Sequence, residues 1–124
     1  MPAPRRPDQP LTAAKKARLL AQADRLAAQL TGGQVSRAEL RPVLNVLFLT
    51  PLPWEERLAQ ARDIVRELPG SWAAKRSKTA PVQYRTVRQV IEPLLKGSPG
   101  EEELRFLLGW TARQVHVRSL ARRT

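Results

Sequence analysis

The carboxylates, hydroxyls and imidazole of this chain determine which chemistry it can support. The sequence has no cysteine and a single histidine, His116, which excludes disulfides, thiolate zinc sites and multi-histidine metal sites. The longest run of acids, Glu101–Glu103, closely follows Ser98 and Pro99, where carboxylates stabilise the first turn of a helix. No serine stands in a nucleophile-elbow or SxxK context, and no glycine-rich phosphate loop is present. We therefore expect no enzymatic activity, no cofactor, and no catalytic or metal-binding residue.

Positive charge is the most informative property of the composition. The 124 residues include 22 Lys+Arg against 11 Asp+Glu, a formal net charge of +11. A field of this sign attracts phosphate backbones, and the planar guanidinium of arginine matches phosphate oxygens. Nucleic acid is therefore the favoured partner, ahead of acidic proteins and membrane surfaces.

The cations concentrate in two stretches that contain no acid, one between Ser71 and Ile91 and one from Leu104 to the C-terminus. Internal salt bridges are hard to assign in such stretches, so we predict that their cations bind nucleic acid. The predicted binding residues are Lys75, Arg76, Lys78, Arg85, Arg88, Arg113, Arg118, Arg122 and Arg123. Trp72 and Tyr84 flank the first stretch and are candidates for stacking on bases. The alternative is that Trp72 anchors the core and the lysines form a solvated loop.

Helix caps and breakers divide the chain into helices. Thr12, the capping box of Ser36 with Glu39, and Ser98 are N-cap signals, whereas Gly32-Gly33, Pro69-Gly70 and Gly97 are stop signals. The predicted helices are 13–30, 37–49, 54–68, 81–96 and one that Ser98 caps and that runs to the C-terminus. No stretch alternates with the period of a strand. We predict an all-α, single-domain bundle over residues 12–124, with residues 1–11 as a flexible arm rich in proline and arginine.

The turn at Gly32-Gly33 also permits a helix-turn-helix, in which helix 37–49 would read DNA. That helix is apolar nearly all round, and a helix of this kind is usually buried, so we expect it in the core. Its only candidates for reading bases are Arg37, Arg41 and Asn45. Binding of the backbone with little sequence preference fits the distributed cations better. Helix 54–68 mixes charges of both signs at helical spacing, which is typical of an ordinary solvated face.

The segment Arg105-Phe106-Leu107-Leu108-Gly109-Trp110, continuing to Arg113-Gln114, resembles the closing helix of large subunits in type I CRISPR Cascade complexes. In several such systems this region is also made separately as the small subunit, and the same general character fits the small subunits of type III effectors. The resemblance implies a basic helical bundle without enzymatic activity. It also implies several copies side by side along a guide RNA, contacting the guide–target backbone or the displaced DNA strand. Gly109 would let the last helix approach a neighbour closely, or alternatively would permit tight packing within the bundle.

Three functions follow as hypotheses. The first is a nucleic-acid-binding subunit of a ribonucleoprotein, with guide RNA or target DNA, other subunits and copies of itself as partners. The alternatives are a stand-alone DNA-binding regulator or nucleoid-type protein, and a basic protein–protein adaptor. No apolar run approaches the length of a membrane span, and the N-terminus lacks the apolar region of a signal peptide. We therefore expect a cytoplasmic location and no membrane partner.

Overall fold

The computed structural model describes residues 11–75 and 77–123, apart from the side chains of residues 72, 73, 122 and 123. Five helices account for most of this chain: α1 (Ala13–Gly32), α2 (Arg37–Leu49), α3 (Trp54–Glu67), α4 (Ala80–Leu95) and α5 (Glu101–Arg123). Two short 3₁₀ turns, η1 (Leu68–Gly70) and η2 (Trp72–Lys75), connect α3 to α4. The described residues contain no strand, so the all-α prediction is confirmed. The predicted N-terminal arm, Leu11 excepted, lies outside the described residues.

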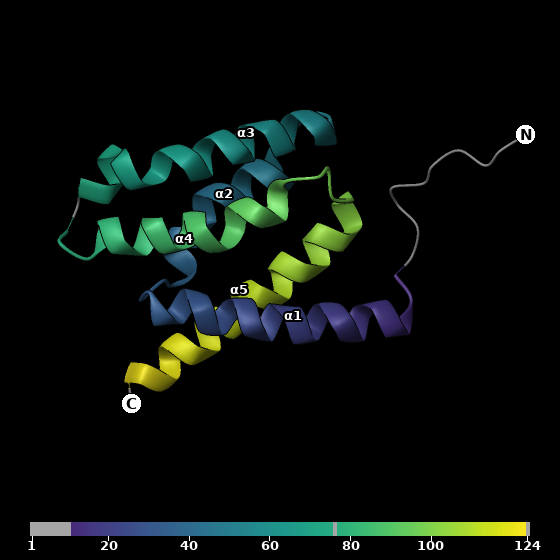
Figure 1. The fold of residues 1–124 in the computed structure, drawn as a ribbon, viewed down its shortest axis with the longest axis horizontal. Coiled ribbons are helices and arrows are strands. Elements are labelled where there is room, and N and C mark those ends of the chain that lie inside the picture. The colour runs from purple at the N-terminus through teal and green to yellow at the C-terminus, as the bar shows by residue number, and fades with distance from the viewer. Residues whose placement is uncertain (1–10, 76, 124) are drawn as a thin grey trace, which may run out of the picture.

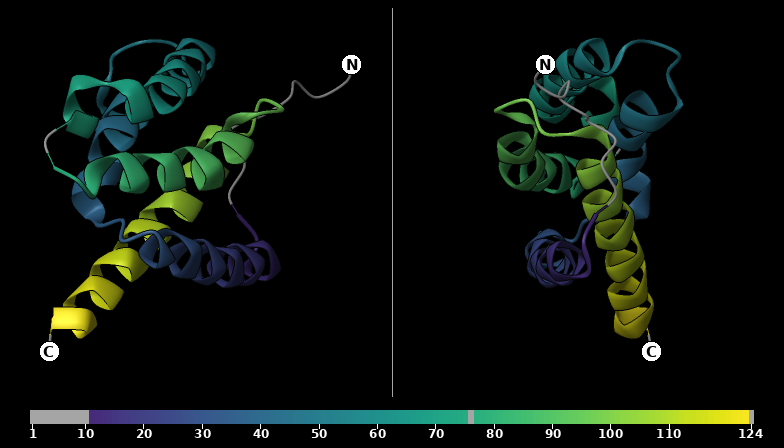
Figure 2. Two further views of the ribbon diagram at one scale, coloured as in Figure 1. Left: turned by 60° about the vertical axis from the view of Figure 1, so that its left-hand side comes forward. Right: turned by 90° about the vertical axis from the view of Figure 1, so that its right-hand side faces the viewer.

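The helices form two groups with α5 passing between them. Helices α2, α3 and α4 pack on one another on one side, and α1 lies on the other side against α5 (Figure 1). The last turns of α5 extend beyond α1, as the second view in Figure 2 shows. This arrangement brings the C-terminal half of α5 near residues that come much earlier in the chain.

Two apolar clusters hold the bundle together. The larger one joins α2, α3 and α4 to the C-terminal end of α1 and to α5, and its most deeply buried side chains include Leu30, Leu47, Leu58, Ile91, Leu95 and Val115. The smaller one lies between α1 and α5 and consists of Leu19, Ala23, Leu26 and Leu107. The apolar stripe of the first helix is therefore buried, as its spacing at i, i+3, i+4 and i+7 indicates.

The start of α2 follows the local sequence signal. Ser36 and Glu39 form the capping box, in which Glu39 Oε1 accepts from the Ser36 N–H at 2.7 Å. Gly33, in the turn before it, is required because a Cβ at this position would overlap the side chain of Thr86 on α4. The turn between α1 and α2 is thus fixed against the beginning of α4.

The start of α5 differs from the prediction. Ser98 does not cap this helix, because it adopts a left-handed conformation with φ 52°, directly after Gly97 with φ 78°. These two residues reverse the chain, and the helix begins only at Glu101. The first helical hydrogen bond runs from the Leu104 N–H to the Gly100 carbonyl at 3.0 Å.

Two further expectations about helix faces hold only in part. Helix α2 does contribute to the core, through Leu40, Val43 and Leu47. Helix α2 is not buried all round: Arg37, Arg41 and Asn45 are exposed along one side, and Leu49 is 74% exposed. Its apolar residues exceed what one buried face can hold, so several are only half-covered. Helix α3 does present a solvated face of mixed charge, with Glu55, Glu56, Asp63, Arg66 and Glu67 exposed, but Arg57 departs from it: this side chain points inward and connects α3 to α2 and α5.

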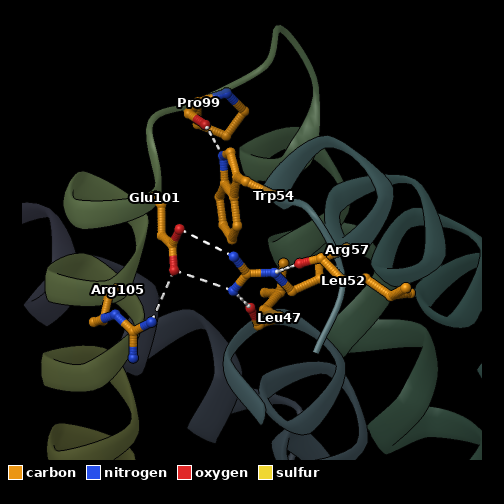
Figure 3. A network of polar contacts seen from close by, with 7 residues as sticks. All are labelled: Leu47, Leu52, Trp54, Arg57, Pro99, Glu101 and Arg105. Atoms are coloured by element: carbon orange, nitrogen blue, oxygen red, sulfur yellow. Dashed lines mark hydrogen bonds and ion pairs between the residues drawn. The ribbon is translucent and has the colours of Figure 1, made fainter. Parts of the chain in front are cut away.

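Arg57 lies at the centre of a polar network beside the start of α5 (Figure 3). Its Nε donates to the Leu52 carbonyl at 2.8 Å, and its Nη1 donates to the Leu47 carbonyl at 2.9 Å. Its two Nη groups each lie 3.1 Å from an oxygen of Glu101. The guanidinium also lies over the Trp54 ring, 5.2 Å from its centroid.

Glu101 is the acceptor that this network holds in its charged form. A second cation beside this carboxylate is Arg105, whose Nη2 donates to Glu101 Oε2 at 2.9 Å. The hydrogen bonds from Arg57 hold the pKa of the Glu101 carboxyl below its ordinary value, and those from Arg105 act in the same direction against the partial burial of the group. The network ties the first turn of α5 to α3 and to the C-terminal end of α2.

Candidate nucleic-acid interface

The first acid-free stretch places its described cations in solvent. Lys75 ends η2, Lys78 lies in the following loop, and Arg85 and Arg88 lie on α4; all four are exposed. Arg88 has a loose ion pair, with its Nε 3.8 Å from Glu92 Oε1 one turn further along. Arg76 lies outside the described residues.

The second stretch is more strongly tied to the rest of the molecule. Arg118 Nη2 lies 3.0 Å from Asp24 Oδ1 on α1, and the guanidinium of the exposed Arg113 lies 4.8 Å from the centroid of the Trp110 ring. The side chains of Arg122 and Arg123 lie outside the described part of the chain.

The expectation that acid-free stretches lack internal partners was therefore wrong for Arg88, Arg105 and Arg118. Their partners are Glu92 and Glu101, just outside the two stretches, and Asp24, on another helix. The absence of acids from a stretch of sequence excludes ion pairs only between neighbours along the chain, whereas packing brings a helix into contact with acids from other segments.

The stacking role expected for Tyr84 was also wrong. Tyr84 is 3% exposed and belongs to the large apolar cluster, because it lies on the inner face of α4, one turn before Val87. A ring in this position cannot meet a base. The side chain of Trp72 lies outside the described residues.

The structure brings together cations that the sequence leaves far apart. The loop before α4, the turn between α1 and α2, and the C-terminal end of α5 lie at the same end of the molecule, as Figures 1 and 2 agree. A hydrogen bond of 2.7 Å from Gln83 Nε2 to the Gln34 carbonyl ties the first turns of α4 to the α1–α2 turn. We call this region the basic end and define it by the side chains of Arg37, Arg41, Lys75, Lys78, His116 and Arg118.

Arg37 and Arg41 were not among the predicted binding residues. They lie in the first turns of α2, are exposed, and form no ion pair with any residue that the structure describes. The available signal was their spacing: two arginines at i and i+4 lie on one face of a helix. From the sequence they are candidates only for reading bases, a role disfavoured by the expectation that the helix is buried nearly all round.

A hollow separates these arginines from α5. It has a volume of about 290 Å³ and is lined by Ser36, Arg37, Ala38, Arg41, His116, Ser119 and Leu120. His116 and Leu120 are exposed at its α5 side. The hollow is thus a junction between the two helices within the basic end.

Four of the exposed acids lie along α3. Glu55, Glu56, Asp63 and Glu67 are exposed along α3, which lies at the opposite edge of the molecule from the C-terminus of α5 (Figures 1 and 2).

Among the described residues, no three His, Cys, Asp or Glu side chains come together as a possible metal site. Within the same part of the chain, no helix is both long and apolar enough to cross a membrane. No protein-family model, curated protein or solved structure matches this chain.

Proposed function

We propose that this protein is a non-catalytic subunit that binds nucleic acid with little sequence preference, through the basic end. The observation that carries the proposal is the convergence of exposed cations from the start of α2 and from the loop before α4 on one end, beside His116 and the half-buried Arg118 of α5. Four of them, Arg37, Arg41, Lys75 and Lys78, form no ion pair with the described residues. Unpaired cations that neutralise phosphates release the counterions condensed on the nucleic acid, which drives binding without reading bases.

The proposed setting is a ribonucleoprotein of the CRISPR effector type, in the cytoplasm, with guide RNA or target DNA backbone as the ligand. The resemblance of the Arg105–Trp110 segment supports it, and so does the position of Gly109. Gly109 is exposed in mid-helix, and a Cβ there would meet nothing within 4 Å in the described chain. Tight packing inside the bundle therefore does not explain this glycine, which favours the alternative that α5 approaches a neighbouring molecule.

A titration of the full chain with RNA, single-stranded DNA and duplex DNA at several salt concentrations tests the proposal. If about five phosphates are neutralised, log K should fall with log salt with a slope of about −3.5 to −4.5. Affinities for unrelated sequences should agree closely. A flat salt dependence would refute nucleic-acid binding and leave the protein–protein adaptor.

The exposed face of α2 favours a second candidate, a DNA-binding regulator. Arg37, Arg41 and Asn45 follow one another at intervals of four residues on this face, the spacing by which a helix presents side chains to a groove. Strong preference for one duplex sequence in the same titration would select this function over backbone binding.

A further inference from the structure

We infer that the hollow between α2 and α5 is a phosphate-binding site, which holds a single phosphate group by side chains from both helices. This inference rests on the proposed function only for the source of the phosphate, a nucleic-acid strand. The remaining cations of the basic end would then contact neighbouring phosphates along the strand, whereas the phosphate held in this hollow would fix the position of the strand on the protein.

The α2 wall supplies the charge. Arg37 and Arg41 are one helical turn apart and both line the hollow. Neither is neutralised by an acid in the described chain. Arginine presents several N–H donors in a planar fork that matches two phosphate oxygens at once, so two guanidiniums on one rim suit a doubly or singly charged phosphate.

The α5 wall supplies polar groups with no other task. His116 is exposed, and an imidazole N–H donates to a phosphate oxygen. Ser119 lies three residues further along the same helix, and its Oγ is shielded from solvent without a hydrogen-bond partner in the described chain. An unsatisfied hydroxyl of this kind is costly to keep. Because the oxygen is closed to solvent, a phosphate oxygen would reach it only after the Ser119 side chain rotates, so His116 is the donor that this wall presents directly.

The backbone at the start of α2 is not the binding group. Ser36 and Glu39 already occupy it: Glu39 Oε1 accepts from both the N–H and the hydroxyl of Ser36, at 2.7 and 2.8 Å. Glu39 is buried and does not itself line the hollow, and its carboxylate is already engaged by Ser36, which does. At about 290 Å³ the hollow lies just below the usual range of small-molecule pockets, a size suited to one phosphate with part of its sugar.

His116 makes the site directly observable. It is the single histidine of the chain, so its imidazole proton resonances need no assignment against others. We expect them to shift saturably when the full chain is titrated with inorganic phosphate at constant pH and ionic strength. Arg37→Gln and Arg41→Gln should each weaken this binding about tenfold, the loss of one charge-assisted hydrogen bond.

Arg18→Gln is the matched control, since Arg18 is an exposed arginine on α1 that does not line the hollow. It should leave the phosphate affinity unchanged. An absence of any saturable shift, or parental affinity in both Arg37→Gln and Arg41→Gln, would overturn the inference. All three replaced side chains are exposed, so the variants should remain folded.

Two oligonucleotides of one sequence, with and without a 5′-phosphate, identify the source. Equal shifts of the His116 signals place an internal phosphodiester in the hollow, whereas shifts with the phosphorylated strand alone place a strand end there. Tight nucleic-acid binding that leaves these signals unmoved would overturn the site but not the proposed function. Saturable phosphate binding without nucleic-acid binding would keep the site and refute the function.

Discussion

Replacing Arg57 by alanine is expected to lower the free energy of unfolding by about 3–4 kcal/mol. The side chain is 13% exposed, and its removal leaves the carbonyls of Leu47 and Leu52 without the donors they now have. Each buried acceptor left unpaired costs about 1–3 kcal/mol. Glu101 keeps Arg105 as a partner, so the loss should fall at the lower end of the 3–5 kcal/mol typical of breaking a buried pair.

Urea denaturation followed by far-ultraviolet circular dichroism measures this loss, and the melting temperature should fall by about 12–16 °C for a chain of this length. Arg66→Ala is the matched control, since Arg66 also lies on α3 and pairs with Glu92 at 3.4 Å but is 57% exposed. Its effect should not exceed about 0.5 kcal/mol. If Arg57→Ala and Arg66→Ala destabilise equally, the Arg57 network does not hold α5 in place.

The remaining predictions concern pH, two glycines and the loop before α4. Because the pKa of Glu101 is lowered in the folded state, its contribution to the free energy of unfolding is complete above the ordinary glutamate value of about 4.3 and is lost as the pH falls through the folded value. Urea denaturation at a series of acidic pH values should therefore show a smaller loss of stability with falling pH for Glu101→Gln than for the parent. Gly109→Ala should raise the free energy of unfolding by about 0.5–1 kcal/mol, since a Cβ at this helical position meets no atom of the described chain within 4 Å. Gly33→Ala should lower it, since its Cβ would overlap the Thr86 side chain, and thermal melts of the two variants measure the difference. Replacing Lys75 and Lys78 by alanine should leave the melting temperature nearly unchanged while reducing the salt slope of nucleic-acid binding by about 0.7–0.9 per lost contact; a parental slope would place the strand elsewhere.

The helices were predictable because their signals are local. The capping box at Ser36, the cap at Thr12 and the stripe from Leu19 to Leu30 each act within a few residues of chain, and each is present as expected. The start of α5 was not predictable in this way. Ser98 has the chemistry of a cap, but the chain must reverse there to bring α5 back across the bundle, and its left-handed φ serves that reversal.

The candidate site depends on contacts between helices, which the periodicity of apolar residues along a single helix does not predict. A helix rich in apolar residues predicts burial but not which face remains open, and for this reason Arg37 and Arg41 were named as possible base readers but not among the predicted binding residues. Arg57 looked like a member of a mixed-charge surface because its partner, Glu101, lies 44 residues away in the sequence. Pairing of Arg118 with Asp24 across α1 and α5 illustrates the same limit, since only the packing of the two helices brings the charges together.

The most direct test of binding through the basic end compares two variants of equal charge. One replaces Arg37, Arg41 and Lys78 by glutamine; the other replaces Lys16, Arg18 and Lys96, which are exposed at the opposite end, in the first turns of α1 and after α4 (Figure 1). Both lower the net charge by three, so they reduce any nonspecific attraction equally. In salt titrations with one oligonucleotide, the first variant should lose about two to three units of slope while the second keeps the parental slope. Equal losses in the two variants would contradict a localised binding end.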